Sequence, residues 1–157
     1  MTKDSLLTRG DVTVVIEYKD GKSETIDFKN TILKSGRNAL VSGLANEIGD
    51  DFDYFISRMI FGDGGTQGGA PKQVEETRTG LFGSARVTKP VIANIDPNNN
   101  TQVVFTSTVS YDEGNGYTLN EMALQLNSGD FYSMATFPGI SKTSTMQITW
   151  NWRLSFI

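Results

Sequence analysis

Carboxylates are the side chains of this protein with the widest scope for chemistry, because the sequence contains no cysteine and no histidine. Thiol nucleophiles, imidazole bases and most transition-metal sites are therefore excluded. Asp63, Asp112 and Glu113 stand beside glycines, as the ligands of calcium loops do, but the full spacing of such a loop is missing. We predict that the protein holds no metal and no cofactor.

A glycine-rich stretch, FGDGGTQGGAPK at residues 61–72, could be read as a phosphate-binding loop. Such a loop requires the pattern G-x-x-x-x-G-K-[ST] between a strand and a helix. Here Lys72 follows Ala70 and Pro71, and no helix signal comes after it. The prediction is a surface or contact loop, with nucleotide binding as the lesser alternative.

Among the strands predicted between residues 54 and 157, Glu121 is the one carboxylate. It either faces solvent at a sheet edge or is buried beside backbone N–H groups or an arginine such as Arg58, Arg86 or Arg153, since an unpaired buried charge is costly. A glycosidase would need a second carboxylate about 5 to 10 Å away, and no candidate is marked. We predict that Glu121 is a structural charge, that the chain has no catalytic residues and that it is not an enzyme.

The last predicted strand, TMQITWNWRLSFI at residues 145–157, alternates strictly between apolar and polar residues. This period places one face in a core and the other in water. Trp150 and Trp152 could stack on a sugar, but they share their parity with Ile148 and Leu154, which favours a core position. We expect the tryptophans and Phe156 to be buried against three apolar residues of other strands, namely Phe105, Leu124 and Phe137.

The charge pattern excludes several partners. The net charge is −4, and the 14 lysines and arginines are scattered, which argues against binding nucleic acid through phosphates. The apolar runs have the length of strands, and the polar start MTKDS is not a signal peptide. We predict no membrane partner and synthesis in a cytosol.

The first half of the chain combines an arm, a hairpin and a helix. Residues 1–10 are polar and carry no period, which indicates an arm. Residues 11–28 predict two strands joined at Asp20-Gly21, where glycine allows the positive φ of a tight turn. Residues 35–48 predict the one helix, with Ser35 as N-cap, Leu44 and Ile48 on its packed side, and Gly49 as its stop.

The second half predicts strands only. They cover residues 54–61, 81–95 with an edge or bend at Pro90, and then 102–111, 117–126 and 131–137 as an antiparallel meander that the last strand closes. No stretch of the sequence has the composition of a linker, so we predict that residues 1–157 form a single domain. The predicted fold is all-β and mainly antiparallel, a β-sandwich-like structure or flattened barrel with one short helix inserted.

Two segments are predicted to bind other subunits. The stretch from residue 62 to residue 80 is too glycine-rich and polar to form core and exceeds the usual length of a connection. Like the arm, it is expected to be mobile in the free subunit and fixed by a partner. Arg78 is the best candidate for an intersubunit ion pair. The predicted assembly interface comprises Leu6, Leu7, Asp63, Gly64, Gly65, Arg78 and Leu81.

The order of several short motifs over residues 54–157 resembles the small β-rich domain that opens the tail-collar fibre proteins of tailed bacteriophages. In that domain a GDG follows the first long strand, as Gly62, Asp63 and Gly64 do here. Two further elements match, a T-hydrophobic-x-E-x-x-L strand and a G-D-hydrophobic hairpin that leads to a proline, carried here by Thr118, Leu119, Glu121 and Leu124 and by Gly129, Asp130, Phe131 and Pro138. The hairpin of residues 11–28 is an addition, and the long shaft of a fibre is missing.

The resemblance implies a non-enzymatic structural protein of the phage virion, assembled in the cytoplasm of the bacterial host. Because no shaft follows the last strand, we expect the module alone, a capsid decoration (cement) protein that stabilises the shell by many symmetric contacts. The alternative is a neck, baseplate or tail-collar attachment protein, and a third hypothesis is a carbohydrate-binding receptor module that uses Trp150 or the tyrosines. Expected partners are the major capsid protein, or neck and baseplate proteins, and further copies in a homo-oligomer or symmetric array.

Overall fold

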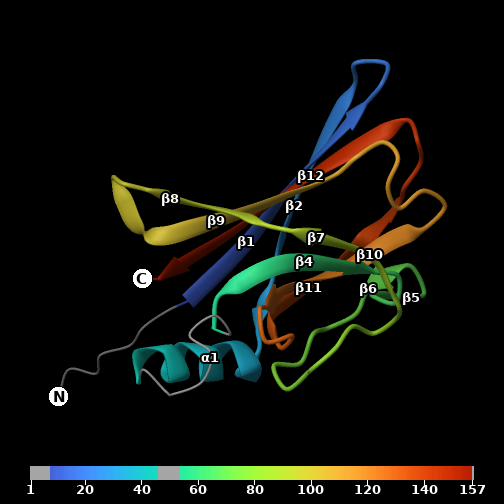
Figure 1. The fold of residues 1–157 in the computed structure, drawn as a ribbon. Helices are drawn as coiled ribbons and strands as arrows, with labels where there is room; N and C mark the ends of the chain where they lie inside the picture. Colours follow the sequence, from blue (N-terminus) through green and yellow to red (C-terminus); the bar gives the residue numbers. More distant parts are fainter. Residues whose placement is uncertain (1–7, 46–53, 157) are drawn as a thin grey trace.

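The computed structural model describes residues 8–45 and 54–156, and it folds them into two antiparallel sheets that pack face to face (Figure 1). The first sheet has the order β2-β1-β12-β9-β8 and the second β3-β11-β10-β4-β7. Both sheets are open at their edges, so the fold is a sandwich rather than a closed barrel. The elements are β1 (Thr8–Tyr18), β2 (Ser23–Lys29), β3 (Thr31–Ile32), α1 (Lys34–Leu44), β4 (Ile56–Gly62), β5 (Thr66–Gln67), β6 (Ala70–Pro71), β7 (Ala85–Pro90), β8 (Ile92–Asp96), β9 (Asn99–Val109), β10 (Thr118–Leu126), β11 (Phe131–Ser141) and β12 (Met146–Phe156).

The alternation of the last strand gives β12 its central place in the first sheet. β12 pairs with β1 on one side and with β9 on the other. Trp150 and Trp152 point inward and are fully buried, and Phe156 is half-buried. Across the core, the rings of Phe61 and Phe137 lie with their centroids 4.6 and 5.3 Å from that of Trp150. The prediction that both tryptophans belong to the core is confirmed.

β1 and β2 form the predicted hairpin, visible in blue in Figure 1. The turn passes through Gly21 with φ +91°, a conformation that glycine adopts without strain. The start of β1 corrects the predicted arm. Thr8 to Gly10 were assigned to it, but they pair with Phe156 to Leu154, because the alternation of β12 continues far enough to give them partners.

The predicted meander is wrong, because the three strands are divided between the two sheets. β10 and β11 are neighbours, but β9 pairs with β12 and β8 in the opposite sheet. Residues 110–117 carry the chain across, turning at Gly114 and Gly116 with φ of +67° and +90°. The buried Lys142 Nζ fixes this crossing by donating to Asn115 Oδ1 at 2.8 Å. Alternation alone does not reveal which sheet a strand joins.

A second crossing occurs at Pro90, where a bend was expected. β7 ends at Pro90 in the second sheet, and β8 begins at Ile92 in the first sheet. Between them, Val91 N donates to the Ser57 carbonyl at 3.2 Å. Proline suits this place because it lacks the N–H that a continuing strand would need.

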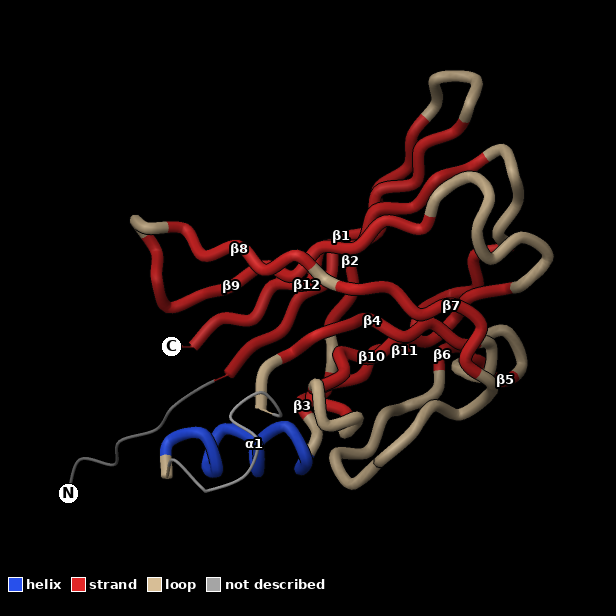
Figure 2. The backbone as a smooth tube through the Cα atoms, viewed as in Figure 1, coloured by secondary structure: helices blue, strands red, loops and turns tan. Residues whose placement is uncertain are grey.

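The helix differs from its prediction at its start and on its packed side. Leu33 occupies the N-cap without a side-chain hydrogen bond, and the Ser35 hydroxyl instead donates to the Phe131 carbonyl and ties α1 to β11. Ala39 is buried, but Leu44 is 90% exposed although it was assigned to the packed side. The predicted positions Ile48 and Gly49 lie outside the described residues. Figure 2 shows α1 beside the sandwich, with strands making up most of the rest.

The core assignment predicts a large stability loss when an indole is removed. Trp152→Ala should lower the free energy of unfolding by about 3 to 5 kcal/mol, because it leaves a cavity between two packed sheets. Urea denaturation of the variant and the wild type measures this. In the folded wild type, acrylamide should quench tryptophan fluorescence poorly; quenching as strong as in the unfolded chain would contradict the core position.

Candidate functional site

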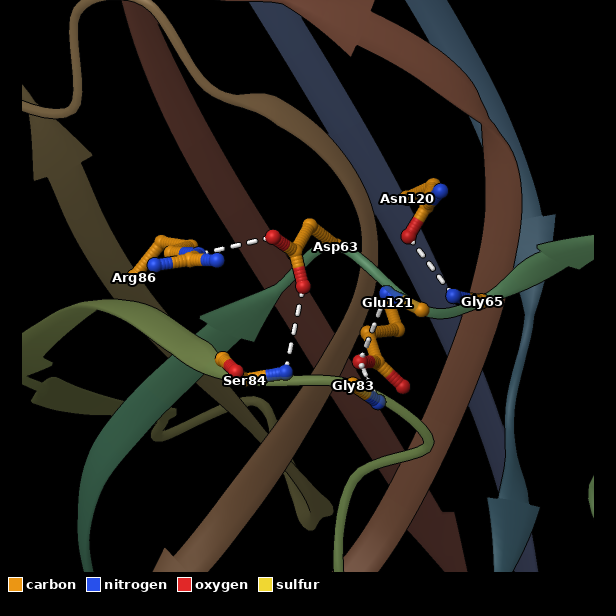
Figure 3. Close-up of polar contacts among 8 residues, drawn as sticks. Asp63, Gly65, Gly83, Ser84, Arg86, Asn120 and Glu121 are labelled. Atoms are coloured by element: carbon orange, nitrogen blue, oxygen red, sulfur yellow. Dashed lines mark hydrogen bonds and ion pairs between the residues drawn. The ribbon is translucent and has the colours of Figure 1, made fainter.

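Glu121 on β10 is fully buried, and its carboxylate is held by backbone N–H groups (Figure 3). Oε1 accepts from Gly64 N at 3.0 Å and from Gly83 N at 2.9 Å, and Oε2 accepts from Phe82 N at 2.8 Å. Of the two kinds of partner considered from the sequence, the structure supplies the backbone groups. None of the ion pairs between described residues includes Glu121. The carboxylate therefore joins the segment after β4 to the segment before β7.

Asn120, the residue before Glu121 on β10, binds the segment after β4 through its side-chain amide. Its Oδ1 accepts from Gly65 N at 2.7 Å, and its Nδ2 donates to Thr66 Oγ1 at 3.0 Å. Adjacent residues of a regular strand point to opposite faces, but the pairing of β10 with β11 is irregular between Leu119 and Glu121. This irregularity lets both side chains reach the same loop.

Asp63 makes a second link between the same two segments. Its Oδ2 lies 2.7 Å from Arg86 Nε, and its Oδ1 accepts from Ser84 N at 3.1 Å (Figure 3). The hydrogen bond from Arg86 is the largest cause that lowers the pKa of Asp63 below its ordinary value of 3.8. The Arg86 guanidinium also lies 4.7 Å from the centre of the Tyr117 ring. Asp63 is thus committed to a partner within the domain.

The glycines of GDGG are required by close approach of backbones. A Cβ on Gly64 would lie 2.2 Å from Gly83 N, and one on Gly65 would lie 2.2 Å from the Asn120 carbonyl oxygen. Neither contact can be relieved by turning a side chain, because both partners are backbone atoms. The N–H groups that a phosphate would use already donate to Glu121 and Asn120. The stretch is therefore built to receive the protein's own carboxylate.

The segment from residue 62 to residue 80 is not the unstructured loop that its composition predicted. It contains the β5–β6 pair, and its backbone is tied to the rest of the domain where Thr136 Oγ1 donates to the Lys72 carbonyl at 2.6 Å and Lys34 N to the Glu76 carbonyl at 2.8 Å. Val74 packs on the outer face of the second sheet. Leu81 and Phe82, which follow this segment in the sequence, pack on the same face. These apolar residues are too widely spaced to form a period, so no sequence pattern predicts this packing.

Arg78, the predicted intersubunit ion-pair residue, has partners in its own segment. Its guanidinium donates to the Gly80 and Leu81 carbonyls at 3.2 and 3.1 Å and stacks 3.6 Å from the centre of the Phe82 ring. Lys72 Nζ also lies against this ring, at 4.9 Å. Arg78 therefore holds the turn that presents Phe82 N to Glu121.

The structure gathers four of the predicted interface residues around Glu121: Asp63, Gly64, Gly65 and Leu81. Leu6 and Leu7 lie outside the described residues. Sequence reasoning missed Asn120, Phe82, Gly83 and Ser84, since neither their types nor their spacing marks them, and it considered Arg86 only as a partner of Glu121.

Among the described residues, the remaining carboxylates do not converge on a reactive centre. Glu113 accepts from Lys89 Nζ through both oxygens at 2.9 Å and belongs to the crossing between the sheets. Among residues 8–45 and 54–156, no group of three or more Asp or Glu side chains is placed to hold a metal ion. A search of the same ranges finds no helix with the length and apolar character needed to cross a membrane.

Comparison with known proteins gives one match. The family model described as phage tail-collar fibre protein, N-terminal, matches residues 26–153. The match begins within β2 and ends within β12, so it starts further upstream than the resemblance over residues 54–157. No curated protein and no solved structure matches the chain.

The hydrogen bonds from Gly64 N, Phe82 N and Gly83 N to the Glu121 carboxylate form what we call the Glu121 anchor. This anchor predicts that a neutral isostere of Glu121 lowers the stability of the domain. In Glu121→Gln an amide NH2 replaces one of two oxygens that face backbone donors, so the unfolding free energy should fall by about 1 to 3 kcal/mol. Denaturant titration measures the loss. Glu76→Gln, which removes an exposed pair with Arg37, is the matched control and should cost about 0 to 1 kcal/mol. Equal losses in the two variants would show that the anchor contributes no more than a surface pair.

The Asp63–Arg86 pair predicts a loss of stability in acid. A carboxyl whose folded pKa is lowered stabilises the protein fully above its unfolded pKa, and this contribution disappears as the pH falls through the folded value. The difference in unfolding free energy between wild type and Asp63→Asn should therefore shrink from about pH 6 to about pH 2. A difference that stays constant over this range would contradict the role of the ionised carboxylate.

Proposed function

The chain belongs to the phage tail-collar fibre family, whose N-terminal region it matches, and on this premise we propose that it is a fibre-attachment domain of the tail. The observation that carries the proposal is the extent of the match, which runs from residue 26 to residue 153. It includes strands of both sheets and the whole network around Glu121. The part of the chain that resembles the family therefore includes every strand of the sandwich except β1, the start of β2 and the last residues of β12.

The geometry supports binding rather than catalysis as the role of this domain. Glu121 is occupied by backbone donors, Asp63 by Arg86 and Glu113 by Lys89. A carboxylate committed to a buried or paired position is a poor proton donor or nucleophile, because it would have to leave partners that stabilise it. What the network provides is a fixed surface.

That surface supports attachment because the glycine-rich segment is held in place before any partner arrives. The tip of the β5–β6 hairpin at Gly68 and Gly69 is exposed, while its base is fastened to Asn120 and Thr136. A contact surface that is already ordered loses less entropy on binding. We include this tip with the half-buried predicted interface residues Asp63, Gly64, Arg78 and Leu81 as the face toward other virion proteins, whereas Gly65 is buried and supports this face from within.

The family match supports the tail over the capsid, so the attachment alternative replaces capsid decoration as the preferred function. The fold does not support carbohydrate binding by the tryptophans, because Trp150 and Trp152 are fully buried and offer no ring face to a sugar. The partners we propose are tail proteins and further copies of this chain in a symmetric arrangement.

Antibody labelling of virions tests the location. Gold-labelled antibodies against the purified chain, applied to intact particles of the phage that encodes it, should mark the tail in electron micrographs. Quantitative mass spectrometry of the same particles should give a copy number close to those of tail proteins and far below that of the major capsid protein. Labelling spread over the capsid, with capsid-like abundance, would overturn the proposal and restore the decoration hypothesis.

A further inference from the structure

The two five-stranded sheets of the described chain end in four edge strands, and three of these are protected against pairing with another molecule. An edge strand exposes unpaired N–H and C=O groups, and proteins protect such edges with charged residues, proline or shortness. β3 is only two residues long. The other two protected edges carry charges or a proline, namely Glu24, Asp27 and Lys29 on β2, and Arg86, Lys89 and Pro90 on β7.

The fourth edge, β8, lacks this protection. Its sequence is IANID, and all five residues are exposed. Ile92 is 68% exposed and Ile95 is 62% exposed. The one charged residue, Asp96, already has a partner in the turn, since its Oδ1 accepts from Asn98 N at 2.9 Å. Among the described strands β8 pairs with β9 alone, so one row of its backbone groups is open to a further strand.

The irregular pairing within the β8–β9 hairpin leaves β8 itself continuous. Asn94 lies opposite Val104, and Asp96 lies opposite Asn99. Two steps along β8 therefore face five steps along β9, so the extra residues belong to the inner strand and not to the edge. The hairpin also extends past the end of the second sheet (Figure 1). The edge of β8 thus keeps the extended form that a partner strand requires.

The side chains of β8 divide between the two faces of the sheet. Ala93 and Ile95 line an open groove on the inner side, whose volume is about 380 Å³ and whose described lining residues are all apolar or aromatic. Ile92, Asn94 and Asp96 point to the opposite, outer side, because successive residues of a strand alternate. A strand that pairs with β8 must therefore present apolar side chains on the inner face.

β8 meets this requirement itself when it pairs antiparallel with β8 of a second copy. Directly opposed residues point to the same face of a sheet, so a two-fold axis perpendicular to the sheet must pass beside a residue that opposes its own counterpart. An axis at Asn94 uses all five residues of β8 and stops short of Pro97. Ala93 of each copy then lies opposite Ile95 of the other copy.

This register gives each group on the edge a suitable neighbour. On the inner face, Ala93 of one copy covers Ile95 of the other, and the two apolar grooves meet across the axis. On the outer face, the two Asn94 amides can donate to and accept from each other. Each Asp96 lies opposite an Ile92, and the two Asp96 residues are about 14 Å apart along the strands, so like charges do not meet.

We propose that β8 is a dimerisation edge: two copies of the chain pair antiparallel through Ile92–Asp96 about a two-fold axis at Asn94 and join their first sheets into one. An interface of this size gives a weak dimer. The inference does not rest on the proposed function, since a chain located on the capsid would pair in the same way. Its tests use the purified chain, whereas the location is tested on virions, so either can fail alone.

A single introduced thiol reports the register, because the chain contains no cysteine. In Asn94→Cys the two substituted residues oppose each other with Cα atoms about 4.5 to 5.5 Å apart, a separation that a disulfide bridges. Oxidation by copper phenanthroline should therefore give a covalent dimer. Ile92→Cys is the matched control on the same outer face, but its two copies lie about 14 Å apart in the dimer, so it should cross-link at least about tenfold more slowly. Equal rates for the two variants would overturn the proposal.

A charge at the axis provides a test without cysteine. Asn94→Lys places two ammonium groups opposite each other, whereas Thr25→Lys adds the same charge to the exposed β2 edge of the same sheet. In sedimentation velocity, wild type and Thr25→Lys should shift from monomer to dimer as the concentration rises toward about 1 mM, and Asn94→Lys should stay monomeric. Tryptophan fluorescence verifies that both variants are folded.

The other outcomes of this experiment count against the pairing. A wild-type chain that remains monomeric over this range would refute it and leave the β8 edge to a strand of another protein. A dimer that Asn94→Lys does not weaken would place the contact elsewhere on the domain, and a trimer would exclude the two-fold axis.

Discussion

A carboxylate that is removed from water must find a counter-ion or hydrogen-bond donors, and Glu121 finds donors in the backbone of two distant segments. Meeting this requirement constrains much of the chain. Gly64 N, Phe82 N and Gly83 N can converge on one carboxylate only if residues 62–65 and 81–84 run side by side. The stretch between them then has to return over the outer face of the second sheet, where Val74 and Phe82 cover apolar residues of the strands.

The anchor and the core meet in adjacent residues of β4. Phe61 is buried against Trp150, and the next residue, Gly62, lies so close to Glu121 that a Cβ would fall 2.6 Å from Oε1. A shift of the carboxylate would therefore move the backbone that carries Phe61. The two tryptophans fix the spacing of the sheets, and the carboxylate fixes the loops relative to the sheets. Because β4 takes part in both the aromatic core and the Glu121 anchor, a change in the core would disturb the anchor, and a change in the anchor would disturb the core.

Sequence reasoning succeeded where a physical signal is local and repeated. The alternation around Trp150 predicted a core strand, Gly21 predicted a hairpin turn, and Pro90 predicted a bend. It failed where the partner is far along the chain. Ser35 looked like an N-cap, but its hydroxyl binds the carbonyl of Phe131, and no local pattern announces a contact of that separation.

The network around Glu121 shows the same limit. The carboxylate could be recognised as structural because it stands in a strand, but its partners are backbone N–H groups, and every residue except proline has one. The glycines of GDGG suggested flexibility or a ligand. Gly64 is instead required by a contact with Gly83 and Gly65 by a contact with Asn120, and both contacts are seen only when the distant segments are placed. For the same reason, the meander was assigned without knowing that residues 110–117 change sheets.

The two ends of β4 lie in parts of the domain that differ in polarity. Gly62 lies at the end closed by Glu121, Asn120 and Asp63, where polar groups have partners and the backbone is fixed. Ile56, at the other end of the same strand, lines an open groove whose described lining residues are all apolar or aromatic. Hydrogen bonds are directional and demand a defined geometry, whereas apolar contacts adapt to their occupant. A partner that needs one orientation is therefore best received at the polar end. The apolar end sets no such requirement, because contact between apolar surfaces is not directional.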